Sequence, residues 1–321
     1  MKRVYVGPKE ITIENSNFFD YSITLFGNNS EKNISYTTNT LDHVLEFEYW
    51  NPDSNPREIK IYNELLKTIK EPFEIMAHDY KIVSQCDIPS NAKLICKNSD
   101  YLISLFNNKK EMRELFQGMV PMLEYQYIKD KDFDFNKLSP KGEMLVVQHP
   151  LGSGGSKTFL CDKDNWKDIK NKLRPDELYI ISFYMKDNIP YNINCVIGSG
   201  NFIIFPPSMQ DLEIGEKIEY VDSFYDIKIK KDVRKKFLDY TTKICLKLKE
   251  LGYRGVLGID YIYTNNELYF IEINPRFQGS SRKLDKILVD NNLPSIFEYN
   301  YLSFNDKRLK SVRKLKNNVY K

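Results

Sequence analysis

Two acidic residues stand inside apolar runs near the C-terminal end of the sequence. Asp260 interrupts the run 256–263, and Glu272 interrupts the run 268–273. A buried carboxylate is costly unless it is paired or binds a metal ion, so acids in such runs suggest a role. Asn274 lies two residues after Glu272 and therefore points to the same side of an extended strand. The two carboxylates and the amide oxygen form an all-oxygen set, which suits Mg²⁺ and leaves room for phosphate oxygens.

The elements that must position these residues are two short strands joined by a turn. The segment 264–266 (TNN) separates the two apolar runs and is typical of a tight turn. A hairpin of the two runs would bring Asp260 and Glu272 to the same side, near one end. Arg276 continues the same alternation and is placed to bind a phosphate group through two hydrogen bonds. The alternative is a hairpin whose acids are simply solvated.

The stretch 258–280 resembles the metal-binding end of the ATP-grasp superfamily of carboxylate–amine and carboxylate–thiol ligases. The resemblance lies in G-x-D at its start and E-x-N-P-R-x-Q-G-S at its end. It implies ATP as the nucleotide. It also implies that Asp260, Glu272 and Asn274 hold one or two Mg²⁺ ions, which Mn²⁺ could replace, between the β- and γ-phosphates.

The same resemblance implies a reaction. A carboxylate attacks the γ-phosphate of ATP, giving an acyl phosphate and ADP, and an amine then displaces phosphate to form an amide. Arg276 would stabilise the transferring phosphoryl group, and Gly279 and Ser280 would lie beside the acyl phosphate. The sequence agrees with phosphoryl transfer, since it has hard-cation ligands but no G-x-S-x-G nucleophile pattern. Two alternatives stay open: loading of an amino acid onto a carrier-protein thiol, and phosphorylation of a hydroxyl group.

A glycine- and serine-rich segment forms a second candidate site, between strand-like runs at 144–147 and 158–160. It consists of Gly152, Ser153, Gly154, Gly155 and Ser156. Glycines let backbone N–H groups approach phosphate oxygens, and serine side chains add donors. The segment resembles the phosphate-covering loop of ATP-grasp enzymes. The family usually has a lysine at the end of the first strand, whereas this chain has Gln148, which carries no charge.

Three lysines are candidates for the missing positive charge. The stretch 108–121 (NKKEMRELFQGMVP) resembles the family's entry to its central lobe, where a lysine at a helix start reaches the nucleotide phosphates. Lys109 fits that position best, Lys110 is one residue away, and Lys157 follows the glycine- and serine-rich segment. The alternative for the first two is a pair of surface lysines that open a helix.

The apolar run 177–185 ends in Phe183, Tyr184 and Met185. It resembles the strand whose end, in the family, holds the adenine edge through backbone groups. Core aromatic residues are the alternative interpretation for these side chains. In the next run Asn192 and Asn194 alternate with apolar residues, so both face one side of a strand, which could be the side of the cleft.

Composition limits the class of protein. The 321 residues, 41% hydrophobic and 13% aromatic, suffice for two or three globular lobes. A net charge of +3 with interspersed signs predicts no binding to nucleic acid. Five scattered cysteines and the lack of a long apolar segment predict a reduced, cytoplasmic protein without a membrane span. The expected partners are small carboxylate and amine substrates, with a peptide, a carrier protein or a homodimer partner as further options.

Alternating strand-like and helical segments predict an α/β (α+β) protein. The resemblance, which covers about 105–300, implies an ATP-grasp fold with the nucleotide bound between the last two of three lobes. We expect a Rossmann-like lobe at 1–105, a small central lid lobe at 106–190 and a C-terminal lobe at 191–321. A helix over 231–251 is expected in the last lobe, with its inner face formed by Phe237, Tyr240, Ile244, Leu246 and Leu248.

Overall fold

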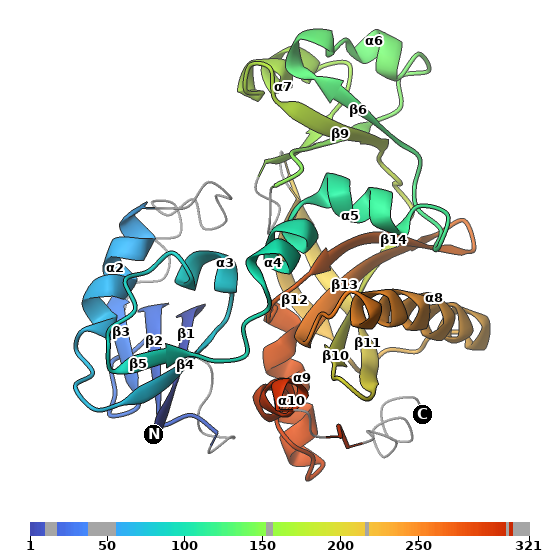
Figure 1. The fold of residues 1–321 in the computed structure, drawn as a ribbon. Helices are drawn as coiled ribbons and strands as arrows, with labels where there is room; N and C mark the ends of the chain where they lie inside the picture. Colours follow the sequence, from blue (N-terminus) through green and yellow to red (C-terminus); the bar gives the residue numbers. More distant parts are fainter. Residues whose placement is uncertain (10–17, 38–55, 152–156, 216–217, 306–307, 311–321) are drawn as a thin grey trace.

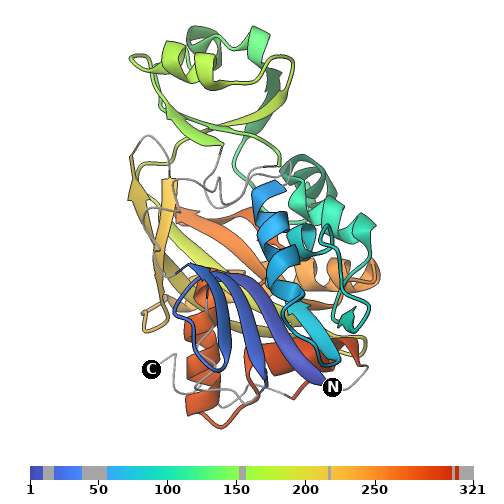
Figure 2. The same ribbon diagram turned by 90° about the vertical axis from the view of Figure 1, so that its left-hand side faces the viewer.

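The computed structural model describes residues 1–9, 18–37, 56–151, 157–215, 218–305 and 308–310. These residues form three β-sheets, each at the centre of one lobe (Figure 1). The N-terminal and C-terminal lobes lie side by side in Figure 1, and the small central lobe stands above the C-terminal lobe. In Figure 2 the N-terminal lobe faces the viewer, in front of the C-terminal lobe.

The N-terminal lobe is built on a parallel sheet with the order β3-β2-β1-β4-β5. Its elements are β1 (Lys2–Lys9), β2 (Tyr21–Phe26), β3 (Asn33–Thr37), α2 (Pro56–Leu66), β4 (Phe73–Ala77), α3 (Tyr80–Val83) and β5 (Ala92–Leu94). Helix α2 packs on β2 and β3. The chain adds β2 and β3 on one side of β1 and then places β4 on the other side. The boundary between β1 and β4 is therefore the topological switch point, where open α/β sheets commonly bind ligands.

The C-terminal lobe contains an antiparallel sheet with the order β12-β11-β10-β13-β14. Its elements are β10 (Ile189–Ile197), β11 (Phe202–Ile214), β12 (Ile218–Phe224), α8 (Lys231–Glu250), β13 (Gly255–Thr264), β14 (Glu267–Asn274), α9 (Gly279–Asp290) and α10 (Ile296–Phe304). Helix α8 covers one face of the sheet, and α9 and α10 cover the other. The second face also packs against the N-terminal lobe, where the Tyr5 and Phe297 ring centroids lie 5.9 Å apart.

The central lobe has a four-stranded sheet with the order β6-β9-β7-β8. Its elements are β6 (Tyr125–Lys129), the 3-10 helix η2 (Asp130–Asp132), α6 (Phe135–Leu138), β7 (Leu145–Gln148), β8 (Thr158–Cys161), α7 (Trp166–Lys172) and β9 (Leu178–Phe183). Phe133, Leu145, Val147, Ile169 and Ile181 are among the buried residues of its own small core. The central lobe therefore has a hydrophobic core of its own, separate from those of the other two lobes.

The helices that precede the central sheet pack elsewhere than expected. Helices α4 (Asp100–Asn107) and α5 (Lys109–Phe116) contact β14 of the C-terminal lobe. Their apolar residues Phe106, Met112 and Phe116 lie in the same core as α8. The expected boundary at 106 is therefore wrong as a packing boundary, because this amphipathic segment buries its apolar side against the C-terminal sheet. The central sheet itself begins at β6.

The predicted hairpin of the C-terminal lobe is present as β13 and β14. Thr264 pairs with Glu267, and Asn265 and Asn266 between them have φ values of 50° and 59°. Asparagine tolerates this left-handed region, and two such residues in succession match the turn that suits the twist of a hairpin. The turn sets the register next to it, from Thr264 with Glu267 to Tyr261 with Phe270. A one-residue register shift between Asp260 and Tyr261 then places Asp260 opposite Glu272.

Candidate active site

The hairpin brings together the four residues that the sequence singled out. Asp260 and Glu272 are paired across β13 and β14. The Asn274 amide lies between them, with its Nδ2 at 2.8 Å from Asp260 Oδ2 and 3.3 Å from Glu272 Oε1. Arg276 Nη2 donates to Asn274 Oδ1 at 3.0 Å. Because Nδ2 faces the two carboxylates, the side-chain amide of Asn274 must flip before its Oδ1 can bind a cation beside them.

The two carboxylates crowd each other electrostatically. Burial raises the pKa of Asp260 to about 7, and the negative charge of Glu272 adds to the effect. On the other side, Lys109 Nζ lies 3.2 Å from Glu272 Oε2. In the described ranges no group of three or more His, Cys, Asp or Glu side chains could hold a metal. Two carboxylates with one amide still fit Mg²⁺, which uses few protein ligands and completes its shell with water and phosphate oxygens.

A buried hydrogen-bond network supports the hairpin from behind. Asn192 Nδ2 donates to Asp260 Oδ1 at 2.6 Å and to Gln278 Oε1 at 2.7 Å. Ser280 Oγ donates to Asn192 Oδ1 at 2.8 Å, and Asn194 Nδ2 lies 2.9 Å from Ser280 Oγ. Asn192 and Asn194 thus face one side of β10, as their alternation predicted. The network holds the Asp260 side chain in one orientation.

The two C-terminal residues expected beside the acyl phosphate start helix α9. The side chain of Ser280 is buried in the network described above rather than exposed to solvent. A Cβ atom on Gly279 would come within 2.5 Å of the Tyr220 ring. Gly279 therefore permits the close approach of β12 to the start of α9, and Ser280 ties α9 to the hairpin support.

The three candidate lysines occupy different environments. Lys109 is 7% exposed and lines the cleft beside Glu272. Lys110 instead pairs with Glu114 at 3.0 Å on the outer side of helix α5. Lys157 lines the same cleft from the start of β8, with φ 57°. The structure therefore places Lys109 and Lys157, but not Lys110, at the cleft.

Arg113 is a cleft residue that sequence reasoning missed. It follows Lys109 by one helical turn on α5, is 7% exposed and lines the same cleft. Its guanidinium carbon lies 5.1 Å from the Tyr125 ring centroid, and its Nε has no hydrogen-bond partner among the described residues. The i,i+4 spacing of the two basic residues was the available signal.

The expected nucleotide-binding residues of the central lobe also line the cleft. They are Gln148, Phe183, Tyr184 and Met185. Gln148 Nε2 lies 3.4 Å from Thr158 Oγ1. The backbone N–H of Tyr184 donates to Met144 O at 2.8 Å, and Met185 O accepts from Asn188 Nδ2 at 2.5 Å. The expected phosphate loop, 152–156, lies outside the described residues.

One continuous cleft of about 1710 Å³ joins these groups. It is lined from the central lobe by Gln148 and Lys157 and from the C-terminal lobe by Asp260 and Glu272. Tyr5, Pro8, Lys9 and His78 line it from the N-terminal lobe. The volume exceeds that of an ordinary small-molecule pocket, so there is room for a nucleotide and a second ligand.

Sequence comparison identifies the class of protein that this fold and site define. A family model described as an ATP-grasp domain matches residues 106–280, more than half of the chain. The protein belongs to the ATP-grasp family. The carbamoyl phosphate synthase large chain of Lachnoclostridium phytofermentans is 28% identical over 162 residues, which cover 48% of this chain and 14% of that relative. The chain thus spans a small part of that relative's length.

Two solved structures show the same fold. N5-carboxyaminoimidazole synthetase from Staphylococcus aureus complexed with ADP has a TM-score of 0.60 at 14% identity, covering 97% of this chain and 79% of that chain. L-amino acid ligase from Bacillus licheniformis has a TM-score of 0.59 at 11% identity, covering 95% and 74%. These similarities confirm the predicted α/β ATP-grasp fold. In the described part of the chain no helix is long and apolar enough to cross a membrane.

Proposed function

We propose that the protein is an ATP-dependent carboxylate–amine ligase that forms an amide bond through an acyl phosphate. The observation that carries the proposal is the hairpin group of Asp260, Glu272, Asn274 and Arg276, set in a cleft that also holds Lys109. Membership of the ATP-grasp family supports it. The likeness to the fold of an L-amino acid ligase is compatible with an amino acid, a dipeptide or a natural product as substrate.

Each residue has a proposed role in phosphoryl transfer. Asp260, Glu272 and Asn274 would hold Mg²⁺, which neutralises phosphate charge when bound. Arg276 stabilises charge on the transferring phosphoryl group, since it lies directly beside Asn274. Lys109 exchanges its contact with Glu272 for a nucleotide phosphate. The reaction needs mainly positioning and charge neutralisation, which these groups supply.

The remaining nucleotide contacts are assigned by position in the cleft. Gln148 and the loop 152–156 would contact the phosphates, and the segment 183–185 would border the adenine. Gly279 and Ser280 begin α9 next to the acyl-phosphate position, where Ser280 acts by orienting Asn192. We also place the protein in the cytoplasm, a proposal supported by its five free, buried cysteines.

Release of ADP and phosphate from Mg-ATP tests the proposal. The purified protein is assayed with bicarbonate and with amino acids, singly and in pairs, beside Glu272→Ala and the exposed-site control Glu250→Gln. We expect turnover that requires a carboxylate and an amine, that is lost in Glu272→Ala and kept in Glu250→Gln. Turnover that needs only a hydroxyl compound would instead identify a phosphotransferase. Turnover that needs a carrier protein would identify a thiol-loading ligase.

A further inference from the structure

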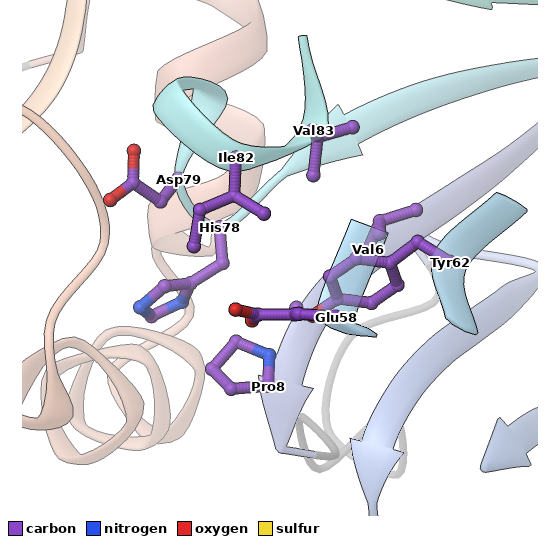
Figure 3. A pocket seen from close by; sticks show the side chains of 9 residues that line it. Val6, Pro8, Glu58, Tyr62, His78, Asp79, Ile82 and Val83 are labelled. Atoms are coloured by element: carbon purple, nitrogen blue, oxygen red, sulfur yellow. The ribbon is translucent and has the colours of Figure 1, made fainter. Parts of the chain in front are cut away.

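A small pocket lies at the switch point of the N-terminal sheet, where β1 and β4 end next to each other (Figure 3). It is lined by Val6, Gly7 and Pro8 of β1, Glu58 and Tyr62 of α2, and His78, Asp79, Ile82 and Val83 after β4. Its volume of about 10 Å³ admits one water-sized group. Pro8 and His78 also line the large cleft, so the pocket adjoins the candidate active site.

Glu58 places a buried carboxyl group at this pocket. It is 3% exposed, and Figure 3 shows its carboxylate extending from α2 toward His78 and Pro8. No residue in the described part of the chain forms a hydrogen bond or an ion pair with it. Burial, with the negative charge of Asp79, raises the pKa of Glu58 to about 8. A buried carboxylate of this kind is costly unless a cation accompanies it.

The titratable groups around Glu58 supply no such cation. Burial and the nearby charge of Arg276 lower the pKa of His78 to about 3, so its ring is neutral. Its Nδ1 lies 2.9 Å from Tyr5 Oη. Burial also raises the pKa of the Cys86 thiol to about 12. Each of these groups is therefore uncharged at neutral pH.

Asp79 is the second acid at the pocket, and it is already engaged. Its carboxylate points away from Glu58 (Figure 3), and Arg276 Nε lies 3.6 Å from its Oδ2. Asp79 also caps helix α3 by accepting from the backbone N–H of Lys81 at 2.8 Å. Arg276 thus forms an ion pair with Asp79 and not with Glu58. Among the described residues, no lysine or arginine lines the pocket.

We propose that this pocket binds the ammonium group of an amine-bearing substrate, with Glu58 as its counter-ion. A primary ammonium group is close in size to water, brings three donors, and supplies the positive charge that the pocket lacks. The switch-point position lets the rest of the substrate extend past Pro8 and His78 into the cleft. The role of the bound amine as a substrate rests on the proposed ligase function, whereas the preference for an ammonium group rests on the pocket alone.

The first experiment measures binding without turnover. Methylammonium chloride is the probe, tetramethylammonium chloride at equal ionic strength is the size control, and thermal unfolding is the readout. The proteins are the wild type, Glu58→Gln and Glu64→Gln, which changes an exposed glutamate on the same helix. We expect methylammonium alone to raise the unfolding temperature of the wild type and Glu64→Gln, with the effect lost in Glu58→Gln.

Proton release separates counter-ion binding from a structural role of Glu58. A bound cation favours the ionised carboxylate, so the wild type should release protons on binding methylammonium at pH 7. Calorimetry in two buffers of different ionisation enthalpy measures this release, which Glu58→Gln should lack. An equal response of Glu58→Gln and the wild type, or no response of the wild type, would overturn the proposal.

The second experiment uses the substrate pair that supports ADP release. Glu58→Gln should raise the KM for the ammonium-bearing substrate roughly ten- to hundredfold, the loss expected for a hydrogen bond to a charged group, and leave the KM for ATP unchanged. An unchanged KM for that substrate would contradict the proposal. If no pair releases ADP, the ligase function fails, and the methylammonium experiment still decides whether the pocket binds ammonium groups.

Discussion

Lys109 Nζ lies 3.2 Å from Glu272 Oε2, which joins the first residue of helix α5 to the β13–β14 hairpin. The two residues are far apart in the sequence, and packing of α5 on β14 brings them together. In this arrangement the lysine neutralises one of two crowded carboxylates. In the proposed function, a cation and phosphates would satisfy both charges separately, and the pair would then couple nucleotide binding to the hairpin.

Replacement of Lys109 by Met should weaken binding of Mg-ATP roughly ten- to hundredfold, because one charged contact to phosphate is lost. Lys110→Met is the matched control, since Lys110 pairs with Glu114 on the outer side of the same helix. Calorimetric titration with a non-hydrolysable ATP analogue measures the effect. A loss in Lys110→Met as large as that in Lys109→Met would contradict the assignment.

Replacement of Glu272 by Gln keeps the size of the side chain but removes its charge. ADP release should fall about 10²–10³-fold, the range found when one group that stabilises transition-state charge is removed. The stabilisation of the fold by added Mg-ATP should also disappear, because the ligand no longer favours the native state. Glu250→Gln, on exposed helix surface, should retain both properties, and full activity of Glu272→Gln would exclude the metal assignment.

Arg113 is the candidate for the charge that Gln148 lacks. Arg113→Gln should lower the affinity for Mg-ATP, and Gln148→Lys in the same chain should restore part of it, since a cation then lines the cleft again. Arg308→Gln, at an exposed position, serves as the control. Titration of the single and double variants measures the effect. Unchanged affinity in Arg113→Gln would show that this arginine does not contact the nucleotide.

The hairpin could be predicted from the sequence because its signals are local. Acids within apolar runs mark the two strands, and two asparagines able to adopt positive φ determine the turn. The register shift between Asp260 and Tyr261, which completes the pairing of Asp260 with Glu272, has no such local signal. The support by Asn192 and the pocket at Glu58 could not be predicted in this way, because they depend on contacts between elements distant in sequence.

The prediction of the inner face of helix α8 was correct only in part. Phe237, Ile244 and Leu248 are buried as expected, but Leu246 is 52% exposed, so its predicted inward position is wrong. Helical periodicity places Leu246 two residues from both Ile244 and Leu248, which puts it on the opposite side of the helix. Leu246 was therefore assigned to the core because it is apolar, although its spacing from Ile244 and Leu248 places it on the exposed side of the helix.

A substitution at Gly258 tests the buried hydrogen-bond network behind Asp260. A Cβ atom at this position would lie 1.6 Å from Gln278 Oε1, which accepts a hydrogen bond from Asn192. Gly258→Ala should displace Gln278 and destabilise the protein by about 1–3 kcal/mol, as overpacking of a core does. Gly200→Ala is the control, because no atom lies within 4 Å of its added Cβ. Urea unfolding measures both variants, and equal stabilities would contradict the predicted clash.

Glu58 gives a prediction about pH and stability. Burial, together with Asp79, raises the pKa of Glu58 in the folded protein from 4.5 to about 8. Between these values the folded state holds a proton that the unfolded state has lost, so the free energy of unfolding should fall as pH rises through this window. The slope for one proton is at most about 1.4 kcal/mol per pH unit.

Glu58→Gln removes this titration while preserving the shape of the side chain. The stability of this variant relative to the wild type should therefore increase from pH 5 to pH 8, as measured by urea unfolding at each pH. The neighbouring Asp79, His78 and Cys86 remain in both proteins, so the difference isolates Glu58. The free energy of unfolding of Glu64→Gln should change with pH in the same way as that of the wild type. A constant difference between Glu58→Gln and the wild type would mean that Glu58 is already ionised in the folded protein, with a cation beside it.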